Sequence, residues 1–293
     1  MTAKPRRSVL YMPGDKPRAL EKARTLAADA LILDLEDSVA PEQKAEARKL
    51  VSEAVKAGGF GRREVTIRVN GLATPWMADD FAMAVAAKPD AILVPKVSSA
   101  DDLSVAAELA KAIPLWAMIE TPLAILNLGE IGRAAATHDL NCLVIGTNDL
   151  VKESRMSSAG GRFVLAPALS QCVLAARAFG LSCIDGVFND LKNEAGFLAE
   201  CEQGKAFGMD GKTLIHPSQV PPCNKVFSPS AEDVAWAKGV VEVFARPENT
   251  GKGVVAHEGR MVERLHLDMA KHILTIAEAV AEGVAEAAAE AVL

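Results

Sequence analysis

The sequence has few cysteines, and none of them has a spacing that would indicate a special role. Its 293 residues include five cysteines, which form neither a Cys-x-x-Cys pair nor a Cys/His pattern typical of a metal site. Their odd number, and the apolar stretches in which several of them lie, favour reduced cysteines in the core of a cytosolic protein over disulfides. The five are Cys142, Cys172, Cys183, Cys201 and Cys223.

An excess of positive charge and a long apolar stretch are also missing. The formal net charge of -6 gives no support for nucleic acid or an anionic membrane surface as a partner. Residues 1–14 are basic but lack the apolar region of a signal peptide. We also identify no apolar run long enough to span a membrane. These absences predict a cytoplasmic protein that binds neither nucleic acid nor a membrane. Any anionic ligand must be bound through local basic residues, against the net charge.

Eight short apolar runs alternate with longer, alanine-rich amphipathic segments. Each run reads as a buried strand that ends in polar or turn residues. Eight such units favour a closed (β/α)8 TIM barrel, an α/β fold, over a doubly wound open sheet. We expect a catalytic barrel domain over residues 1–228. The predicted strands lie within residues 8–14, 30–37, 64–71, 91–98, 115–120, 142–149, 182–190 and 212–220.

The regular alternation ends after about residue 228. Residues 229–293 contain a capped helix, a Pro/Gly/Asn break at 246–253, a hairpin-like or irregular segment, and a long alanine-rich helix. We expect a C-terminal helical extension. Its pattern is compatible with packing on its own barrel and with reaching a neighbouring subunit.

Polar side chains follow the predicted strands, and in a barrel the carboxyl ends of the strands converge on the face that carries the chemistry. The stretch LILDLED, residues 31–37, places three carboxylates in four positions at one strand end. This is costly unless a positive group lies nearby. The strand-end polar residues are Asp34, Glu36, Asp37, Arg68, Asn70, Lys96, Glu120, Asn148, Asp149, Asp185, Asn189 and His216.

Glu120 and Asp149 each end one of two successive strands. Two carboxylates at neighbouring strand ends can hold a divalent cation such as Mg²⁺, with water and substrate oxygens completing the octahedron. The alternative is that each carboxylate caps the helix that follows. Because both face the acidic cluster at 34–37, we predict a metal site, with a cation that lets these carboxylates lie close together.

Basic residues at the same end have two readings each. Arg68 is either a bidentate clamp for a carboxylate or enolate oxygen or a salt-bridge partner of Glu36 or Asp37. Arg18 and Lys22 follow a Pro-Gly turn and form either an anion site or a solvated face. His216 is either a general base or a residue that shapes the turn before Pro217.

Seven segments together resemble the citrate lyase β-subunit-like (HpcH/HpaI aldolase) family, in family order, between about residues 6 and 276. The segments are RSVLYMPGDKPRALEKA, LILDLEDSVAPEQKAEAR, IRVNG, ILVPKV, IETP, VIGTNDL and GKTLIHPSQV. The resemblance implies a barrel enzyme acting on malyl-type CoA thioesters.

The resemblance also implies roles for individual residues. Mg²⁺, with Mn²⁺ as a substitute, is expected on Glu120 and Asp149. Arg68 is expected to stabilise charge on the thioester oxygen, and Asp37 is expected to be catalytic with it. Coenzyme A, as part of the substrate, is expected near Arg18 and Lys22. The family further implies a homo-oligomer, a trimer or a dimer of trimers, in which the C-terminal segment of one subunit covers the site of the next. Further substrate contacts are expected from Gly146, Thr147 and Asn148.

One position departs from the pattern of the family's lyases. Glu263 stands where they carry an aspartate that supports proton transfer, and this change resembles the malyl-CoA thioesterase branch. We therefore expect hydrolysis of (3S)-malyl-CoA to malate and CoA, with Glu263 acting on water. The alternatives are C–C cleavage by a malyl-CoA or citramalyl-CoA lyase, the lyase β subunit of a citrate lyase complex, and a non-enzymatic CoA-binding relative.

Overall fold

A computed structural model describes residues 4–290 of the chain, with the backbone alone at 158–159 and 284–290. It divides into two compact units, one of residues 6–224 and a smaller one formed mainly by the residues from Lys225 onward. Each unit has its own core and is described separately below.

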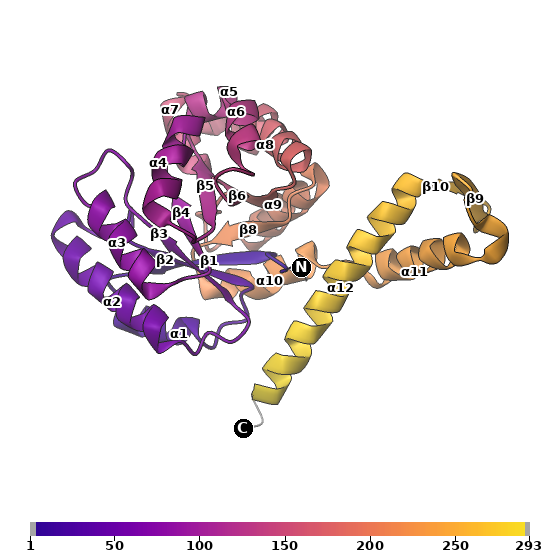
Figure 1. Ribbon diagram of the computed structural model, residues 1–293, viewed down its shortest axis with the longest axis horizontal. Coiled ribbons are helices and arrows are strands. Elements are labelled where there is room, and N and C mark those ends of the chain that lie inside the picture. Colours follow the sequence, from indigo (N-terminus) through magenta and orange to yellow (C-terminus); the bar gives the residue numbers. More distant parts are fainter. Residues whose placement is uncertain (1–3, 291–293) are drawn as a thin grey trace. The chain divides into compact units, whose positions relative to one another are not determined.

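The larger unit is a closed barrel of eight parallel strands in sequential order, as predicted (Figure 1). Every predicted run contains a strand, but the strands end earlier than the runs. In the run at 30–37, for example, the strand stops at Asp34, and the two following acidic residues belong to the loop. The strands are β1 (Ser8–Pro13), β2 (Ala30–Asp34), β3 (Glu64–Arg68), β4 (Ala91–Val94), β5 (Leu115–Ile119), β6 (Leu140–Ile145), β7 (Ser182–Asp185) and β8 (Gly211–Leu214).

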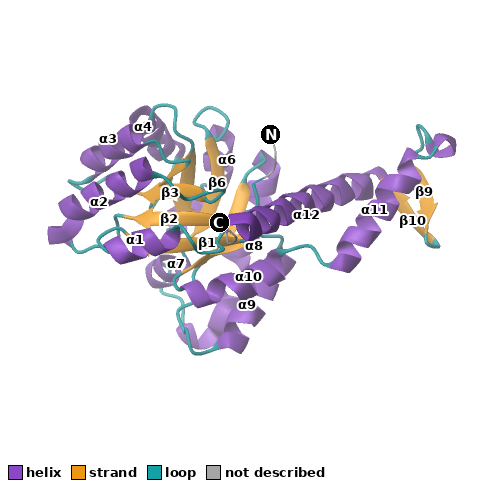
Figure 2. Cartoon of the chain, turned by 90° about the horizontal axis from the view of Figure 1, so that it is seen from below, coloured by secondary structure: helices purple, strands orange, loops and turns teal. Residues whose placement is uncertain are grey.

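Helices surround the strands on the outside of this unit (Figure 2). Two of the helical segments begin with residues typical of helix N-termini. Ser99 caps α4 in a capping box with Asp102, and Pro41 opens a short 3-10 turn that leads directly into α2. The helices are α1 (Pro17–Ala23), α2 (Lys44–Ala57), α3 (Met77–Ala87), α4 (Ala100–Ala110), α5 (Pro122–Leu126), α6 (Leu128–Ala134), α7 (Thr147–Glu153), α8 (Ala166–Phe179), α9 (Glu194–Phe207) and α10 (Val220–Phe227), with 3-10 turns η1 (Pro41–Gln43), η2 (Ser158–Leu165) and η3 (Pro217–Gln219).

One helical segment corrects an expectation. Among the described residues, Gly160–Phe179 is long and apolar enough to cross a membrane by length and composition, although we expected no such run. It comprises the end of η2 and all of α8, whose buried face packs against β6 and β7. A core helix of a barrel passes the same test, because its inner face is apolar and alanine makes up much of the rest.

The barrel interior is filled rather than hollow. Its inward side chains form a fully packed apolar cluster that includes Val9, Ile32, Leu93, Trp116 and Val144. At the amino end of the strands, Arg6 crosses the barrel: it forms a bidentate ion pair with Glu64, donates to Ser182 Oγ at 2.9 Å, and lies 4.8 Å from the ring centre of Trp116. The five cysteines are free and buried, as expected.

The smaller unit consists of a helix pair and a hairpin. The helices are α11 (Ala231–Ala245) and α12 (Arg264–Glu290), and the hairpin joins β9 (Val254–His257) to β10 (Arg260–Glu263), after a 3-10 turn η4 (Pro247–Asn249). The segment predicted as hairpin-like or irregular is therefore a hairpin. Glu258 and Gly259 form its two-residue turn, both with positive φ, which suits the twist of antiparallel strands. Val255 and Val262 pack into the core of this unit.

Candidate active site

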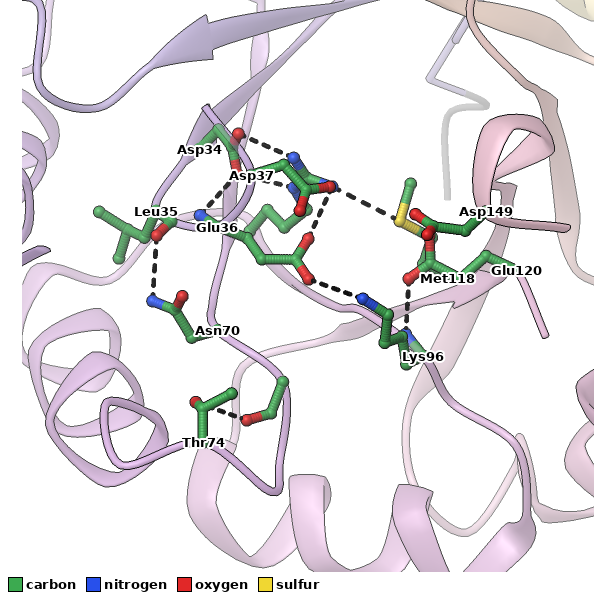
Figure 3. A network of polar contacts seen from close by, with 12 residues as sticks. Asp34, Leu35, Glu36, Asp37, Asn70, Thr74, Lys96, Met118, Glu120 and Asp149 are labelled. Atoms are coloured by element: carbon green, nitrogen blue, oxygen red, sulfur yellow. Dashed lines mark hydrogen bonds and ion pairs between the residues drawn. The ribbon is translucent and has the colours of Figure 1, made fainter. Parts of the chain in front are cut away.

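Arg68 is the positive group that the acidic stretch requires. Asp34 and Arg68 are direct register partners at the ends of β2 and β3. The guanidinium binds the Asp34 carboxylate with two hydrogen bonds, Nε to Oδ1 at 2.6 Å and Nη2 to Oδ2 at 2.8 Å (Figure 3). Burial alone would raise the pKa of Asp34, but the charge and hydrogen bonds of Arg68 lower it below the usual value. The salt-bridge reading of Arg68 is confirmed, with Asp34 as the main partner.

The two other carboxylates share the remaining side of the same guanidinium. Arg68 Nη1 lies 2.8 Å from Glu36 Oε2 and 3.3 Å from Asp37 Oδ2. Asp37 is largely exposed, whereas Glu36 is nearly buried. Burial raises the pKa of Glu36 to about 7, helped by the charges of Asp37 and Asp34 and opposed by Arg68 and Lys96. The cluster therefore holds more negative charge than Arg68 alone balances.

Lys44 fixes the loop that carries these carboxylates, and the sequence analysis missed it. Its ammonium donates to the main-chain oxygens of Leu35 and Glu36, both at 2.7 Å, and lies over the ring of Trp76. Asn70 adds a hydrogen bond to the Leu35 oxygen at 3.0 Å. Burial lowers the pKa of Lys44 despite the nearby carboxylates. Because Lys44 lies ten residues after the end of β2, only the fold reveals that it reaches this loop.

Glu120 directly follows β5, whereas Asp149 was expected to end a strand and lies instead in the first turn of α7, after β6 (Figure 3). The two are close enough for the charge of Asp149 to act on Glu120. Glu120 is buried, and its Oε1 accepts the backbone N–H of Lys96 at 2.9 Å. A Cβ atom on Gly146 would overlap the Glu120 carboxylate, so only glycine at this position allows the two strand ends to come so close. Asp149, in the first turn of α7, is partly exposed, with Lys152 Nζ 3.9 Å from its Oδ1.

This pair fits a hard divalent cation. Burial raises the pKa of Glu120 to about 8, and the charges of Glu36 and Asp149 act in the same direction against Arg68. A cation between Glu120 and Asp149 would offset this repulsion. Within residues 4–290, no set of three or more Asp, Glu, His or Cys side chains is arranged to hold a metal. Two carboxylates with open positions for water and substrate oxygens are typical of Mg²⁺ sites.

We expect the stability of the metal-free protein to fall as the pH rises from about 5 to 8.5. A carboxyl whose pKa is about 8 when folded and near 4.5 when unfolded binds more protons in the folded state, so the free energy of unfolding decreases through this window. The loss should be on the order of a few kcal/mol. Asp34 does not contribute, because its lowered pKa keeps it ionised throughout.

The measurement is urea unfolding in EDTA across this pH range. Glu120→Gln should flatten the decline, leaving only the smaller share of Glu36. An equally steep decline in the variant would show that Glu120 titrates normally.

Four other predicted site residues lie on helices that follow barrel strands, two of them on α7 and two on α1. Thr147 and Asn148 begin α7 beside Asp149, and Asn148 exchanges hydrogen bonds with Asn189 at the end of the next strand. Arg18 and Lys22 are exposed on α1, one turn apart and thus on one side of the helix. They follow β1, whose carboxyl end lies on the same face as the carboxylates.

Two strand-end residues have structural roles instead. His216 caps η3: its Nδ1 accepts from the Ser218 backbone, as the turn-shaping reading proposed. Asp185 was expected on the converging face, but it is completely buried in ion pairs with Lys212 and Arg162. Since Ile184 points into the barrel core, the adjacent Asp185 points outward.

Glu263 belongs to the C-terminal unit. It is the last residue of β10, its side chain is exposed, and its backbone N–H donates to His266 Nδ1 at 2.9 Å. The hairpin register places Val254 and Met261 on the same sheet face as Glu263, opposite the buried Val255 and Val262. Val254 and Met261 are exposed apolar side chains, and we call these two the hairpin patch.

Comparisons with known proteins agree with this geometry. The HpcH/HpaI aldolase/citrate lyase family matches residues 7–217, and a C–C bond lyase of the TIM-barrel fold matches residues 164–281. A (3S)-malyl-CoA thioesterase of Cereibacter sphaeroides is 49% identical over 95% of this chain and 97% of its own. The citrate lyase subunit beta of Escherichia coli is 34% identical, with 93% of each chain covered.

Solved structures give the same result. The CitE protein of Mycobacterium tuberculosis, in complex with magnesium, acetoacetate and coenzyme A, is 31% identical, with a TM-score of 0.76 over 94% of this chain and 98% of that one. The expected resemblance is therefore confirmed, and with it the expectation of an enzyme rather than a non-enzymatic relative. The chain belongs to the HpcH/HpaI aldolase/citrate lyase family.

Proposed function

We propose that this enzyme hydrolyses a 3-hydroxy-dicarboxylyl-CoA thioester in a Mg²⁺-dependent reaction, with (3S)-malyl-CoA as substrate and malate and CoA as products. The observation that carries a metal-assisted carbonyl reaction is the pair formed by the buried Glu120 and the partly exposed Asp149, close enough to Arg68 for its charge to act on Glu120. The choice of hydrolysis is supported by the high identity to a (3S)-malyl-CoA thioesterase over nearly the whole chain.

Glu120 and Asp149 would hold the cation, which when bound supplies a Lewis acid and a template for the carboxylate and the adjacent hydroxyl of the acyl group. Arg68 would offset the negative charge that grows on the thioester oxygen, at the edge of the guanidinium that faces away from Asp34. Asp37, on the exposed loop, would keep that edge oriented through its contact with Nη1. Exposed Arg18 and Lys22 would bind the phosphates of CoA, and Gly146, Thr147 and Asn148 would line the acyl group.

Hydrolysis requires one water and one proton acceptor. Glu263 would accept a proton from the water as its oxygen attacks the thioester carbonyl. The C–S bond then breaks, and the proton passes to the sulfur of CoA. Mn²⁺ is proposed as a substitute for Mg²⁺, and a cytoplasmic location stays a prediction.

We further propose that Glu263 acts in the site of a neighbouring subunit of a homo-oligomer, a trimer or a dimer of trimers. The hairpin patch supports this, because apolar side chains exposed on the same sheet face as the Glu263 carboxylate are unfavourable in water and suit a protein interface. Under this proposal the C-terminal extension covers the barrel mouth of the next copy.

Product analysis tests the reaction directly. With malyl-CoA and Mg²⁺ we expect free malate and CoA in equal amounts. If the protein releases mainly acetyl-CoA and glyoxylate, the thioesterase proposal is wrong and C–C cleavage takes its place.

Cleavage is the second candidate because the same residues serve it. A base would remove the hydroxyl proton, and Arg68 would stabilise the enolate of acetyl-CoA. The match of residues 164–281 to the family of C–C bond lyases of the TIM-barrel fold supports this alternative. The length of the C-terminal extension does not separate it from a citrate lyase β subunit, because such a subunit aligns with 93% of this chain.

Arg68→Lys should lower kcat roughly 10²-fold, about the effect of losing one charge-stabilising donor. Lysine keeps the positive charge but loses the planar fork that binds Asp34 at two points. The measurement is steady-state hydrolysis, with circular dichroism as a check that the barrel is intact. A folded variant with a near-normal kcat would make Arg68 a structural ion-pair partner alone.

A further inference from the structure

Lys96 lies at the centre of the carboxylate cluster, in the turn that follows β4. Its backbone has a φ of 56°, in the left-handed region that a lysine rarely adopts. This conformation directs the backbone N–H to Glu120 Oε1 at 2.9 Å, while the side chain returns toward Glu36 (Figure 3). Non-glycine residues in this region are strained, and such strain is concentrated at functional sites.

The Lys96 ammonium faces a surplus of negative charge. Its Nζ is 3.7 Å from Glu36 Oε1, a loose ion pair, and its side chain is 44% exposed. Burial tends to lower the pKa of Lys96, but the surrounding carboxylates outweigh burial and raise the pKa above the usual lysine value. These carboxylates are Glu36, Glu120, Asp149 and Asp37.

The other cations near the cluster cannot take this role. Lys44 is buried, and its ammonium is held by the main-chain oxygens of Leu35 and Glu36. Arg68 is nearly buried, and its three nitrogens already contact Asp34, Glu36 and Asp37. Lys96 is therefore the cation of this cluster that is held loosely enough to move.

We propose that Lys96 is the counter-cation of this carboxylate cluster and competes with the divalent metal ion for it. Without metal, the ammonium offsets the charge of Glu36 and the Glu120–Asp149 pair. A divalent cation on Glu120 and Asp149 would be repelled by the Lys96 ammonium, which the same carboxylates attract, so the ammonium must withdraw toward solvent. The long, exposed side chain permits this, while the backbone N–H continues to orient Glu120. This inference rests on the metal site of the proposed function, not on the choice between hydrolysis and cleavage.

The test is the binding of Mn²⁺ to the full-length protein without acyl-CoA, followed by the electron paramagnetic resonance of free Mn²⁺. Lys96→Met removes the charge and keeps a long side chain at the same strained position. It should bind Mn²⁺ about 5- to 10-fold more tightly, as expected when a like charge is removed from a partly screened site. Lys96→Gly, which also relieves the backbone strain, should show the same gain. Lys96→Arg should stay within about twofold of the wild type, because it keeps the charge.

Lys152→Met is the matched control. Lys152 also lies near a proposed ligand, 3.9 Å from Asp149, but its side chain is 80% exposed and screened by water. Its loss should change Mn²⁺ affinity less than about twofold.

Unchanged or weaker Mn²⁺ binding in both Lys96→Met and Lys96→Gly would overturn the competition while leaving the metal site in place. A gain in Lys96→Gly alone would also overturn it, because backbone strain rather than charge would then be the cause. Failure of the wild type to bind Mn²⁺ would remove the metal site itself, and the proposed function with it.

Discussion

An Asp149→Ala protein should lose about 10³-fold in kcat on malyl-CoA, together with most of its affinity for Mg²⁺. The Glu120–Asp149 pair supplies the only two protein ligands in the proposed site, so removing one leaves a single carboxylate and weakens both binding and orientation. Lewis-acid catalysis is worth several kcal/mol of transition-state stabilisation, which corresponds to a factor of this size.

The measurements are calorimetric titration with Mg²⁺ and steady-state kinetics at saturating metal. Asp79→Ala is the matched control: Asp79 is an exposed carboxylate that pairs with Arg48 away from the cluster, and its loss should leave both quantities unchanged. If the Asp149 variant keeps wild-type activity and metal affinity, the metal is bound elsewhere and the site must be reassigned.

The second large effect is expected at Glu263. Glu263→Ala should abolish both hydrolysis and any residual cleavage, because it removes the proposed proton acceptor while leaving the barrel untouched. Glu263→Asp should keep some activity and raise the ratio of cleavage to hydrolysis, since the shorter carboxylate withdraws from the water by about 1 Å, a displacement that matters in catalysis. Product analysis by chromatography measures both. Glu248→Ala, at an exposed glutamate of η4 in the same unit, should behave as wild type.

Mixed oligomers decide whether Glu263 acts between subunits. Co-expression of Glu263→Ala and Asp149→Ala chains should restore activity, although each variant is inactive alone. A site with an intact barrel then receives an intact Glu263 from its neighbour in about a quarter of random 1:1 pairings. No recovery in oligomers verified to contain both chains would place Glu263 in its own subunit's site or outside catalysis.

Most of the fold could be predicted from the sequence, because the alternation of apolar runs with amphipathic segments and the polar residues at strand ends are local signals. Each of the eight runs contains a strand, and the segment left open as hairpin-like or irregular is a hairpin. Strand parity could also have excluded Asp185, whose neighbour Ile184 faces the core. The prediction that Asp185 lies on the converging face was wrong, because alternate residues of a strand point to opposite sides of the sheet.

Hydrogen bonds and ion pairs between residues far apart in the sequence could not be predicted. Nothing local says that the Lys44 ammonium reaches back to two carbonyls of the acidic loop, or that the backbone N–H of Lys96 meets Glu120. The bidentate pair of Asp34 and Arg68 depends on strand register, which is set by the packing of the whole barrel. The acidic stretch itself could be recognised as needing a cation, but the supply of positive charge from three directions appears only in three dimensions.

The position of Arg6 across the amino end of the barrel has a consequence for the order in which products leave the enzyme. This arginine contacts Glu64, Ser182 and Trp116 across the amino end of the strands, and apolar side chains fill the barrel interior. Together they close the amino end of the barrel. Small molecules therefore reach the site from the carboxyl end of the strands. Under the proposed function, malate bound at the carboxylates can leave only through the opening that CoA occupies. We therefore expect CoA to dissociate first, and to inhibit the binding of the next substrate when it dissociates slowly.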